Sequence, residues 1–140
     1  MKTIVVMACG GSGSRMNAGV NKILLPLAGK TVVRRSLEAF DGLVDEIVLC
    51  VRPDDEPRLR QEAGLADVSC PVRIVSGGAT RQESVLNGLK SVSWGADDLV
   101  LVHDAARCLV EPDLIRRVIE SCIRSGSGVP AIPAVSTFKL

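Results

Sequence analysis

Short apolar runs alternate with helix-like hydrophobic stripes along the 140 residues of the chain. Runs rich in β-branched residues predict buried strands at 3–7, 46–51, 71–75, 99–103 and 127–135. Apolar residues spaced three and four positions apart predict helices around 33–40, 85–92 and 114–123, and a weaker helix at 58–64. We expect the weaker helix to end at Gly64 and the last helix to begin near Pro112.

This alternation indicates βαβ units, and therefore a three-layer α/β fold in which helices cover both faces of a mostly parallel sheet. No repeat, low-complexity tract or linker interrupts residues 1–140, so we expect a single domain. Ligands bind such sheets beyond the carboxyl ends of the strands. Three loops follow predicted strands and are expected to meet at that edge: "ACGGSGSRM" (8–16), "SGGATRQES" (76–84) and "HDAARCLV" (103–110).

Composition narrows the classes of partner. A net charge of +1 and an aromatic content of 2% give neither a general positive field nor stacking platforms, so we expect no nucleic-acid partner. The apolar runs are far shorter than the roughly 20 residues that span a bilayer, so we expect no membrane partner. Five scattered cysteines without a C-x-x-C pair predict reduced thiols in the core of a cytoplasmic protein.

The first loop fails two well-known phosphate-binding patterns. A Walker A loop needs a second glycine followed by lysine, but Arg15 stands five residues after Gly10. The dinucleotide fingerprint G-x-G-x-x-G matches Gly11 and Gly13 and then meets Met16. A dinucleotide-dependent oxidoreductase is therefore disfavoured.

The second strand weakens the dinucleotide interpretation further, because it leads into Arg52 and not into a carboxylate that could hold a ribose. What remains is a glycine-rich turn whose backbone N–H groups can surround phosphates, followed by the cations Arg15 and Lys22. A plain strand-to-helix turn is the alternative explanation.

The second loop contains a helix start. Thr80 and Glu83 have the spacing of a capping box, which is a structural device. The box does not account for Gly77–Gly78, where the backbone could closely approach a flat ring, or for Ser84 in the first turn. Arg81 opposes the helix dipole, so we expect another group to hold it.

The third loop places His103 and Asp104 where an apolar strand ends. A carboxylate there, close to a phosphate loop, suggests a Mg²⁺ ligand. We expect a structural hydrogen bond for His103, and we expect Arg107 to pair with Asp104 or with nearby backbone in preference to a ligand.

Taken in order, these loops resemble the 2-C-methyl-D-erythritol 4-phosphate cytidylyltransferases of isoprenoid precursor synthesis. The family patterns are A-x-G-x-G-x-R-M, P-K-Q, G-G-x-x-R-x-x-S-V, V-H-D-A-A-R-P and D-T-x-K. The corresponding stretches here are "CGGSGSRM", "NKI", "GGATRQESV", "VHDAARCLV" and "STFK". The resemblance runs through essentially the whole chain and implies a Rossmann-like nucleotide-diphospho-sugar transferase fold.

The resemblance implies an enzyme that transfers a cytidylyl group from CTP to a sugar-alcohol phosphate and releases pyrophosphate, with Mg²⁺ as cofactor. Arg15 and Lys22 match the cations that stabilise the pentavalent transition state. Asp104 matches a Mg²⁺-linked carboxylate, Ala105 lies beside the ribose in this scheme, and Thr137 matches a contact to the substrate phosphate. Positions that match contacts to cytosine and ribose are Cys9, Gly10, Gly78, Ala79 and Ser84.

The chain departs from the family pattern at several positions. Asn21 and Ile23 flank Lys22 in place of proline and glutamine, and Cys108 replaces a proline. Ser136 replaces the aspartate before Thr137, so ribitol 5-phosphate cytidylyltransferase stays open as an alternative.

Length is the largest departure, because the family continues well past "STFKL" into a dimerising arm and further site residues. We therefore expect a fold that lacks its C-terminal part, and a homodimer only for the full-length protein. The chain alone is expected to bind CTP weakly and turn over negligibly, and a non-catalytic nucleotide-binding fragment is an alternative.

Overall fold

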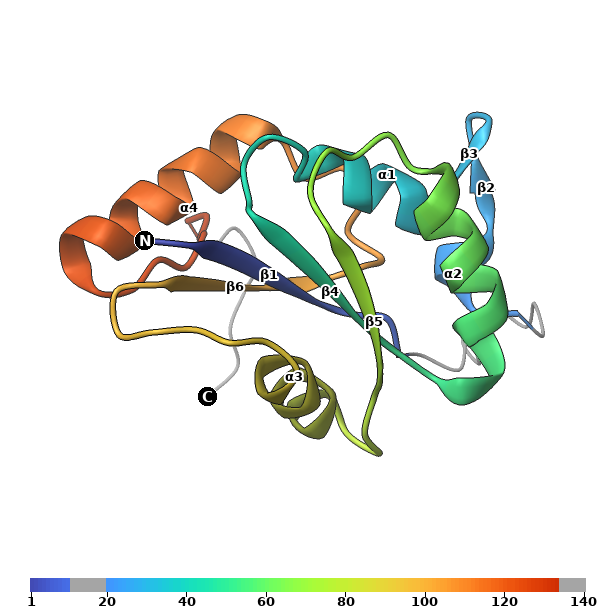
Figure 1. Ribbon diagram of the computed structural model, residues 1–140. Coiled ribbons are helices and arrows are strands. Elements are labelled where there is room, and N and C mark those ends of the chain that lie inside the picture. Colours follow the sequence, from blue (N-terminus) through green and yellow to red (C-terminus); the bar gives the residue numbers. More distant parts are fainter. Residues whose placement is uncertain (11–19, 134–140) are drawn as a thin grey trace, which may run out of the picture.

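A sheet of parallel strands forms the centre of the protein in the computed structural model, which describes residues 1–10 and 20–133 (Figure 1). Its strands are β1 (Thr3–Ala8), β4 (Glu46–Val51), β5 (Val72–Ser76) and β6 (Leu99–Asp104). They lie in the order β5-β4-β1-β6, and each neighbouring pair is parallel. The predicted α/β fold with a mostly parallel sheet is confirmed.

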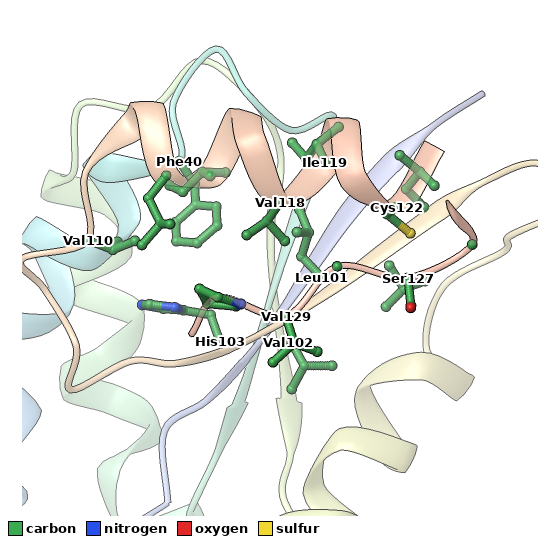
Figure 2. A pocket seen from close by; sticks show the side chains of 17 residues that line it. Phe40, Leu101, Val102, His103, Val110, Val118, Ile119, Cys122, Ser127 and Val129 are labelled. Carbon is green, nitrogen blue, oxygen red and sulfur yellow. The ribbon is translucent and has the colours of Figure 1, made fainter. Parts of the chain in front are cut away.

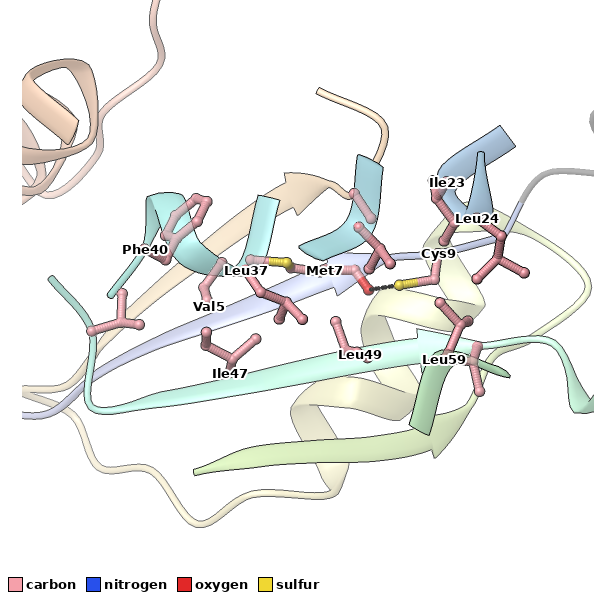
Figure 3. Packing of buried hydrophobic residues seen from close by; sticks show 14 of the residues in the cluster. Val5, Met7, Cys9, Ile23, Leu24, Leu37, Phe40, Ile47, Leu49 and Leu59 are labelled. Carbon is pink, nitrogen blue, oxygen red and sulfur yellow. Dashed lines mark hydrogen bonds between the residues drawn. The ribbon is translucent and has the colours of Figure 1, made fainter. Parts of the chain in front are cut away.

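Helices cover both faces of this sheet, as expected for three layers (Figure 1). They are α1 (Val32–Ala39), α2 (Glu56–Leu65), α3 (Arg81–Lys90) and α4 (Pro112–Ser125). One face packs against α1, α2 and α4 through a cluster that includes Leu37, Leu59 and Ile115 (Figure 3). α3 covers the other face. Within the described residues, none of the helices has the length and apolar character that a bilayer crossing requires.

The alternation of side chains along β1 explains how the strand serves both layers. Val5 and Met7 belong to the cluster under α1 and α2, whereas Ile4 and Val6 belong to the cluster under α3. All four of these side chains are 0% exposed. Successive residues of a strand point to opposite faces, so a continuous apolar run is what a doubly covered strand requires.

β1 lies between β4 and β6, so the chain first builds the sheet to one side of β1 and then returns to its other side. The point where the strand order reverses leaves a crevice outside the carboxyl ends of the neighbouring strands. The loops at 76–84 and 103–110, and the described beginning of the first loop at 8–10, leave the carboxyl ends of β5, β6 and β1, so these segments lie along one edge.

Small elements after β1 were not predicted. They are the 3-10 turn η2 (Lys22–Leu24), the antiparallel strands β2 (Pro26–Leu27) and β3 (Lys30–Thr31), and the 3-10 turn η3 (Pro53–Asp55). Ala28 and Gly29 connect β2 to β3 with φ values of 48° and 83°. Such two-residue strands are too short to show an alternating pattern in the sequence.

Two sequence expectations are wrong. The expected strand at 127–135 is absent over its described part, 127–133, where Val129 and Ile132 are 86% and 85% exposed. Pro130 and Pro133 lack the N–H donor that a sheet ladder needs, and the remaining two residues lie outside the described ranges. The helix expected to end at Gly64 continues to Leu65, since a single glycine weakens a helix but does not stop it.

The five cysteines, which all lie in the described ranges, are free thiols. Cys9 and Cys50 are buried, as expected for core residues, but Cys70, Cys108 and Cys122 are only partly buried. Burial raises the pKa of Cys50 to about 11, so this thiol stays protonated and unreactive at neutral pH.

A cavity of about 450 Å³ lies between α4 and β6, where side chains from the two elements face one another (Figure 2). The ring of His103 borders it and meets Phe40 edge-on, with 4.9 Å between ring centroids. Nε2 of His103 lies 3.2 Å from the carbonyl oxygen of Arg107, which is the structural hydrogen bond expected for this residue. Burial lowers the pKa of His103 below its ordinary value of 6.5, and the hydrogen bond to Arg107 opposes that shift only in part.

The position of α3 generates a prediction about Gly88. A Cβ atom there would lie 2.6 Å from Cγ1 of Val6 and 2.7 Å from Sγ of Cys50, so the helix approaches the sheet too closely for a side chain. Gly88→Ala should lower the free energy of unfolding, because overpacking costs about 1–3 kcal/mol and exceeds the helix gain of about 0.5–1 kcal/mol. Urea denaturation measures the change.

Gly64→Ala is the matched control, since a Cβ there meets nothing within 4 Å and the residue also lies in a helix. That variant should gain up to about 1 kcal/mol. Equal effects of the two substitutions would show that the contact between α3 and the sheet does not decide stability.

The lowered pKa of His103, the single histidine of the chain, predicts a pH-dependent stability. As the pH falls below about 6.5, the unfolded chain takes up this proton more readily than the folded one, so stability decreases on acidification. The decrease between pH 7.5 and 5.5, measured by urea denaturation, should be smaller in His103→Gln. The same pH dependence in both proteins would contradict the prediction.

Candidate active site

A cleft of about 800 Å³ lies beyond the carboxyl ends of the strands. Its wall comes from the end of β1, from η2, from the residue after β4, from the turn before α3 and from the turn after β6. The charged side chains on this wall are Lys22, Arg52, Arg81, Arg107 and Asp104. Among the described residues, four cations and one carboxylate line the cleft, which makes it suited to a polyanionic ligand.

Most of the residues predicted for the site are brought together in this cleft. Those that line it directly are Gly10, Lys22, Gly78, Ala79, Arg81, Ser84 and Asp104. Cys9 and Ala105 lie just behind the wall, at 1% and 0% exposure. The other predicted site residues, which are Gly11, Gly13, Arg15 and Thr137, lie outside the described ranges and stay predictions.

Backbone hydrogen bonds carry the parallel sheet past its last strand residues and so hold the loops in register. The N–H of Cys9 donates to the carbonyl of Cys50 at 3.0 Å, and the N–H of Ala105 donates to the carbonyl of Ala8 at 3.1 Å. On the other side of β4, the N–H of Gly77 donates to Val51 at 2.7 Å. The loops therefore start from a shared rigid edge.

The turn before α3 is closed by its own side chains. The predicted capping box is present: Thr80 caps the N–H of Glu83, and the Glu83 carboxylate accepts from the N–H groups of Ala79 and Thr80. The Ser84 hydroxyl accepts from the N–H of Gly78 at 3.0 Å and donates to the carbonyl of Thr80 at 2.9 Å. The N–H groups of 78–80 are thus used within the protein.

This turn also explains its glycines. A Cβ at Gly78 would collide with the Cβ of Glu83, and one at Gly77 would lie 3.0 Å from the Ser84 hydroxyl. The close return of the chain onto α3 therefore requires glycine at 78 and leaves little room for a side chain at 77. Their predicted contact with a flat ring is an additional role that stays a prediction.

Two arginines hold the carboxylate of Asp104. Nε of Arg81 lies 2.9 Å from Oδ1, and Nε of Arg107 lies 3.0 Å from Oδ2. The expected partner for Arg81 is thereby identified, and the expected pairing of Arg107 is confirmed. Partial burial works to raise the pKa of Asp104, but the two guanidinium groups outweigh it and hold that pKa below its ordinary value. Asp104 is therefore ionised at neutral pH.

Asp104 is also the carboxylate available to a divalent cation. Within residues 1–10 and 20–133, no cluster of three or more His, Cys, Asp or Glu residues could hold a metal. Each oxygen of Asp104 accepts one bond from an arginine, and a carboxylate oxygen can accept two. Asp104 thus fits a Mg²⁺ ion that takes its other ligands from phosphates.

Lys22 enters the cleft from η2. It is the exposed member of that turn, because Ile23 and Leu24 are buried in the core at 2% and 3% exposure (Figure 3). Lys22 lines the cleft, and no salt bridge to its ammonium group occurs within the described part of the chain.

Sequence reasoning did not assign Arg52 and Asn21 to the site, although both line the cleft. Arg52 directly follows the apolar run of β4, and this position at a strand end was a signal that could have placed it there. Its nearest carboxylate among the described residues, that of Asp54, is 3.8 Å away. Asn21 makes contacts to residues that are distant in sequence, and no local sequence pattern predicts these contacts.

Known proteins are similar to this chain over nearly its whole length. The sequence pattern of the 2-C-methyl-D-erythritol 4-phosphate cytidylyltransferase family matches residues 3–140. A relative of that name from Acidobacterium capsulatum is 38% identical over an alignment of 146 positions, gaps included. The alignment covers 99% of this chain and 61% of the relative. The bifunctional enzyme IspD/IspF of Anaeromyxobacter dehalogenans is 47% identical over 141 residues, which cover 99% of this chain and 34% of that enzyme.

A solved structure is also similar. The crystal structure of 4-diphosphocytidyl-2C-methyl-D-erythritol synthase from Anaerococcus prevotii matches with a TM-score of 0.72 at 26% identity, over 89% of this chain and 52% of that one. The chain thus spans 61% or less of the length of these three proteins. A family match from residue 3 to residue 140 shows that this chain belongs to the 2-C-methyl-D-erythritol 4-phosphate cytidylyltransferase family.

Proposed function

We propose that the protein containing this chain transfers a cytidylyl group from CTP to 2-C-methyl-D-erythritol 4-phosphate and releases pyrophosphate. The observation that carries the proposal is the cleft that joins Lys22, the Arg81–Asp104–Arg107 group and the turn at 78–80. Membership of the family supports the choice of substrates.

In the proposed reaction, a phosphate oxygen of the sugar alcohol attacks the α-phosphorus of CTP. A phosphorus–oxygen bond forms there, the bond from the α-phosphorus to the bridging oxygen breaks, and its electron pair leaves with pyrophosphate. Both reactants are anions, so negative charge concentrates at the α-phosphoryl group in the transition state. A fixed ammonium group such as that of Lys22 stabilises this charge, and Arg15 is proposed to do the same.

The turn before α3 supports recognition of cytosine. Among the described residues, the carbonyl oxygens of Gly78 and Ala79 accept no hydrogen bond, while the N–H groups of the turn are engaged by Ser84 and Glu83. Cytosine carries an amino group that donates hydrogen bonds, whereas uracil and thymine carry an acceptor oxygen at that position. A surface of carbonyl acceptors therefore favours CTP over UTP.

A divalent cation belongs to the proposal, with Asp104 as its protein ligand. When bound, Mg²⁺ would neutralise charge on the triphosphate. Asp104 itself keeps Arg81 and Arg107 aimed at the cleft, where their remaining N–H donors can meet phosphate oxygens.

Location and assembly are also proposals. We place the reaction in the cytoplasm, where cysteines persist as free thiols, like the five of this chain. A homodimer is proposed on the family resemblance.

One assay distinguishes the proposed reaction from two alternatives. The protein expressed from its complete reading frame is incubated with CTP, Mg²⁺ and either methylerythritol phosphate or ribitol 5-phosphate, and pyrophosphate release is measured. Faster release with ribitol 5-phosphate would reassign the alcohol. Calorimetric binding of CTP without release from either alcohol would indicate a nucleotide-binding module instead of an enzyme.

Lys22→Met tests the role of the ammonium group. Loss of one preorganised group aimed at transition-state charge should lower kcat by about 10²–10³-fold, with a much smaller change in CTP affinity. Lys90→Met is the control, because Lys90 lies in the last turn of α3 and outside the cleft lining. Equal losses in kcat and in affinity would make Lys22 a ground-state binder.

Asp104→Asn tests the cation site. The substitution removes a negative charge from the cleft and also weakens the pairing with the two arginines, so CTP binding in the presence of a chelator is the reference for each protein. The factor by which Mg²⁺ tightens CTP binding in calorimetry should shrink, because an amide is a poorer ligand for Mg²⁺ than a carboxylate. Asp113→Asn, at an exposed ion pair on α4, is the control. An unchanged Mg²⁺ factor would leave Asp104 as an anchor for the arginines only.

A further inference from the structure

The side chain of Asn21 joins three segments at the floor of the cleft. Its Nδ2 donates to the carbonyl of Cys9 and to Oδ2 of Asp55, each at 2.9 Å. Its Oδ1 accepts from the N–H of Ile23 at 3.3 Å. The residue is 5% exposed, so these bonds form largely out of contact with water. One amide thus connects the end of β1, η3 after β4, and η2.

The turn that carries Lys22 is held from both sides. The N–H of Leu24 donates to the carbonyl of Asn21 at 2.9 Å, and the N–H of Leu25 donates to the carbonyl of Lys22 at 3.2 Å. Ile23 and Leu24 anchor the turn in the same core cluster as Cys9 (Figure 3). Lys22 therefore projects from a backbone that has little freedom to move.

We infer that Asn21 is a positioning residue, which fixes the backbone of Lys22 relative to the wall of the cleft formed by the end of β1. The inference rests on the proposed function and deepens it. Orientation of a reacting or charge-stabilising group decides rate steeply, because a misplacement of 1 Å can cost about 100-fold. The proposed role of Lys22 thus depends on a neighbour that touches no reacting atom.

A simple cap of the 3-10 turn would not require asparagine. Capping needs only an acceptor for the N–H of Ile23, which aspartate or serine also provides. The two N–H donors of Nδ2 instead reach across to Cys9, twelve positions away in sequence, and to Asp55, 34 positions away. An aspartate would set its carboxylate against the Cys9 carbonyl and against Asp55. The contacts with Cys9 and Asp55 therefore require the amide of asparagine at position 21.

Two substitutions separate the contacts. Asn21→Asp keeps the size of the side chain and the cap of Ile23 but loses both donors and adds a charge beside Asp55. The double variant Asn21→Asp with Asp55→Asn restores a hydrogen bond between 21 and 55, as well as the original net charge. It leaves the Cys9 carbonyl without its donor.

We expect kcat to fall by about 10- to 100-fold in Asn21→Asp while KM for CTP changes little, because Lys22 is displaced and not removed. In the double variant the melting temperature should recover and kcat should stay low. Asn87→Asp is the matched control, since exposed Asn87 also donates from Nδ2 to a backbone carbonyl, that of Ser76, outside the cleft. A kcat that recovers together with the melting temperature would overturn the inference.

A measurement that needs no enzymatic turnover tests the role of Asn21 independently of the proposed reaction. Amide hydrogen exchange of residues 22–25 should speed up by about 3- to 10-fold in the charge-balanced double variant, the effect of losing one hydrogen bond. Exchange in α3 should not change. Absence of transfer activity in the unaltered protein would defeat the proposed function alone, whereas unchanged exchange at 22–25 would defeat the role of Asn21.

Discussion

Burial of β1 on both faces is the constraint on which the rest of the molecule depends. Ile4, Val5, Val6 and Met7 are excluded from water, alternately by the layer under α1 and α2 and by the layer under α3. A shift of one residue would exchange the two sets of side chains, so the register against β4 and β6 is fixed. The ends of three strands are thereby brought to one level, and the cleft follows from that alignment.

Electrostatics gives this edge its chemical character. Asp104 stands at the end of β6 and divides its charge between Arg81 from α3 and Arg107 from the following turn. Asp104 orients the two arginines, and each guanidinium group keeps further N–H donors for a ligand. Together with Lys22 and Arg52 they leave an excess of positive charge in a cleft whose net balance could not be inferred from the +1 of the whole chain.

Much of the architecture could be predicted because it depends on local pattern. The apolar runs that became β1, β4, β5 and β6, and the spacing of Thr80 and Glu83, carry their structure within a few residues. The prediction of a strand was wrong over 127–133. This run is as apolar as a strand, but its prolines lack the N–H donors that hydrogen bonding in a sheet requires. The site was harder: the contacts of Asn21 with Cys9 and Asp55 arise only after the strands align, and a pattern confined to neighbouring positions cannot contain them. The role of Gly88 was hidden for the same reason, since the atoms that exclude a side chain belong to β1 and β4.

The occupied N-terminus of α3 has a consequence for how the CTP of the proposed reaction would lie in the cleft. A helix start normally offers free N–H groups and a partial positive charge to phosphate, but here the Glu83 carboxylate already takes the N–H groups of Ala79 and Thr80 and places a negative charge beside them. This carboxylate disfavours a polyphosphate on the backbone N–H groups of the turn, whereas an uncharged ring with hydrogen-bond donors meets no such repulsion, and the guanidinium group of Arg81 remains on the wall of the cleft. For the CTP of the proposed reaction, this arrangement favours a base against the turn at 78–80 and a triphosphate toward Lys22 and the two arginines, so the capping box contributes to the polarity of the bound ligand.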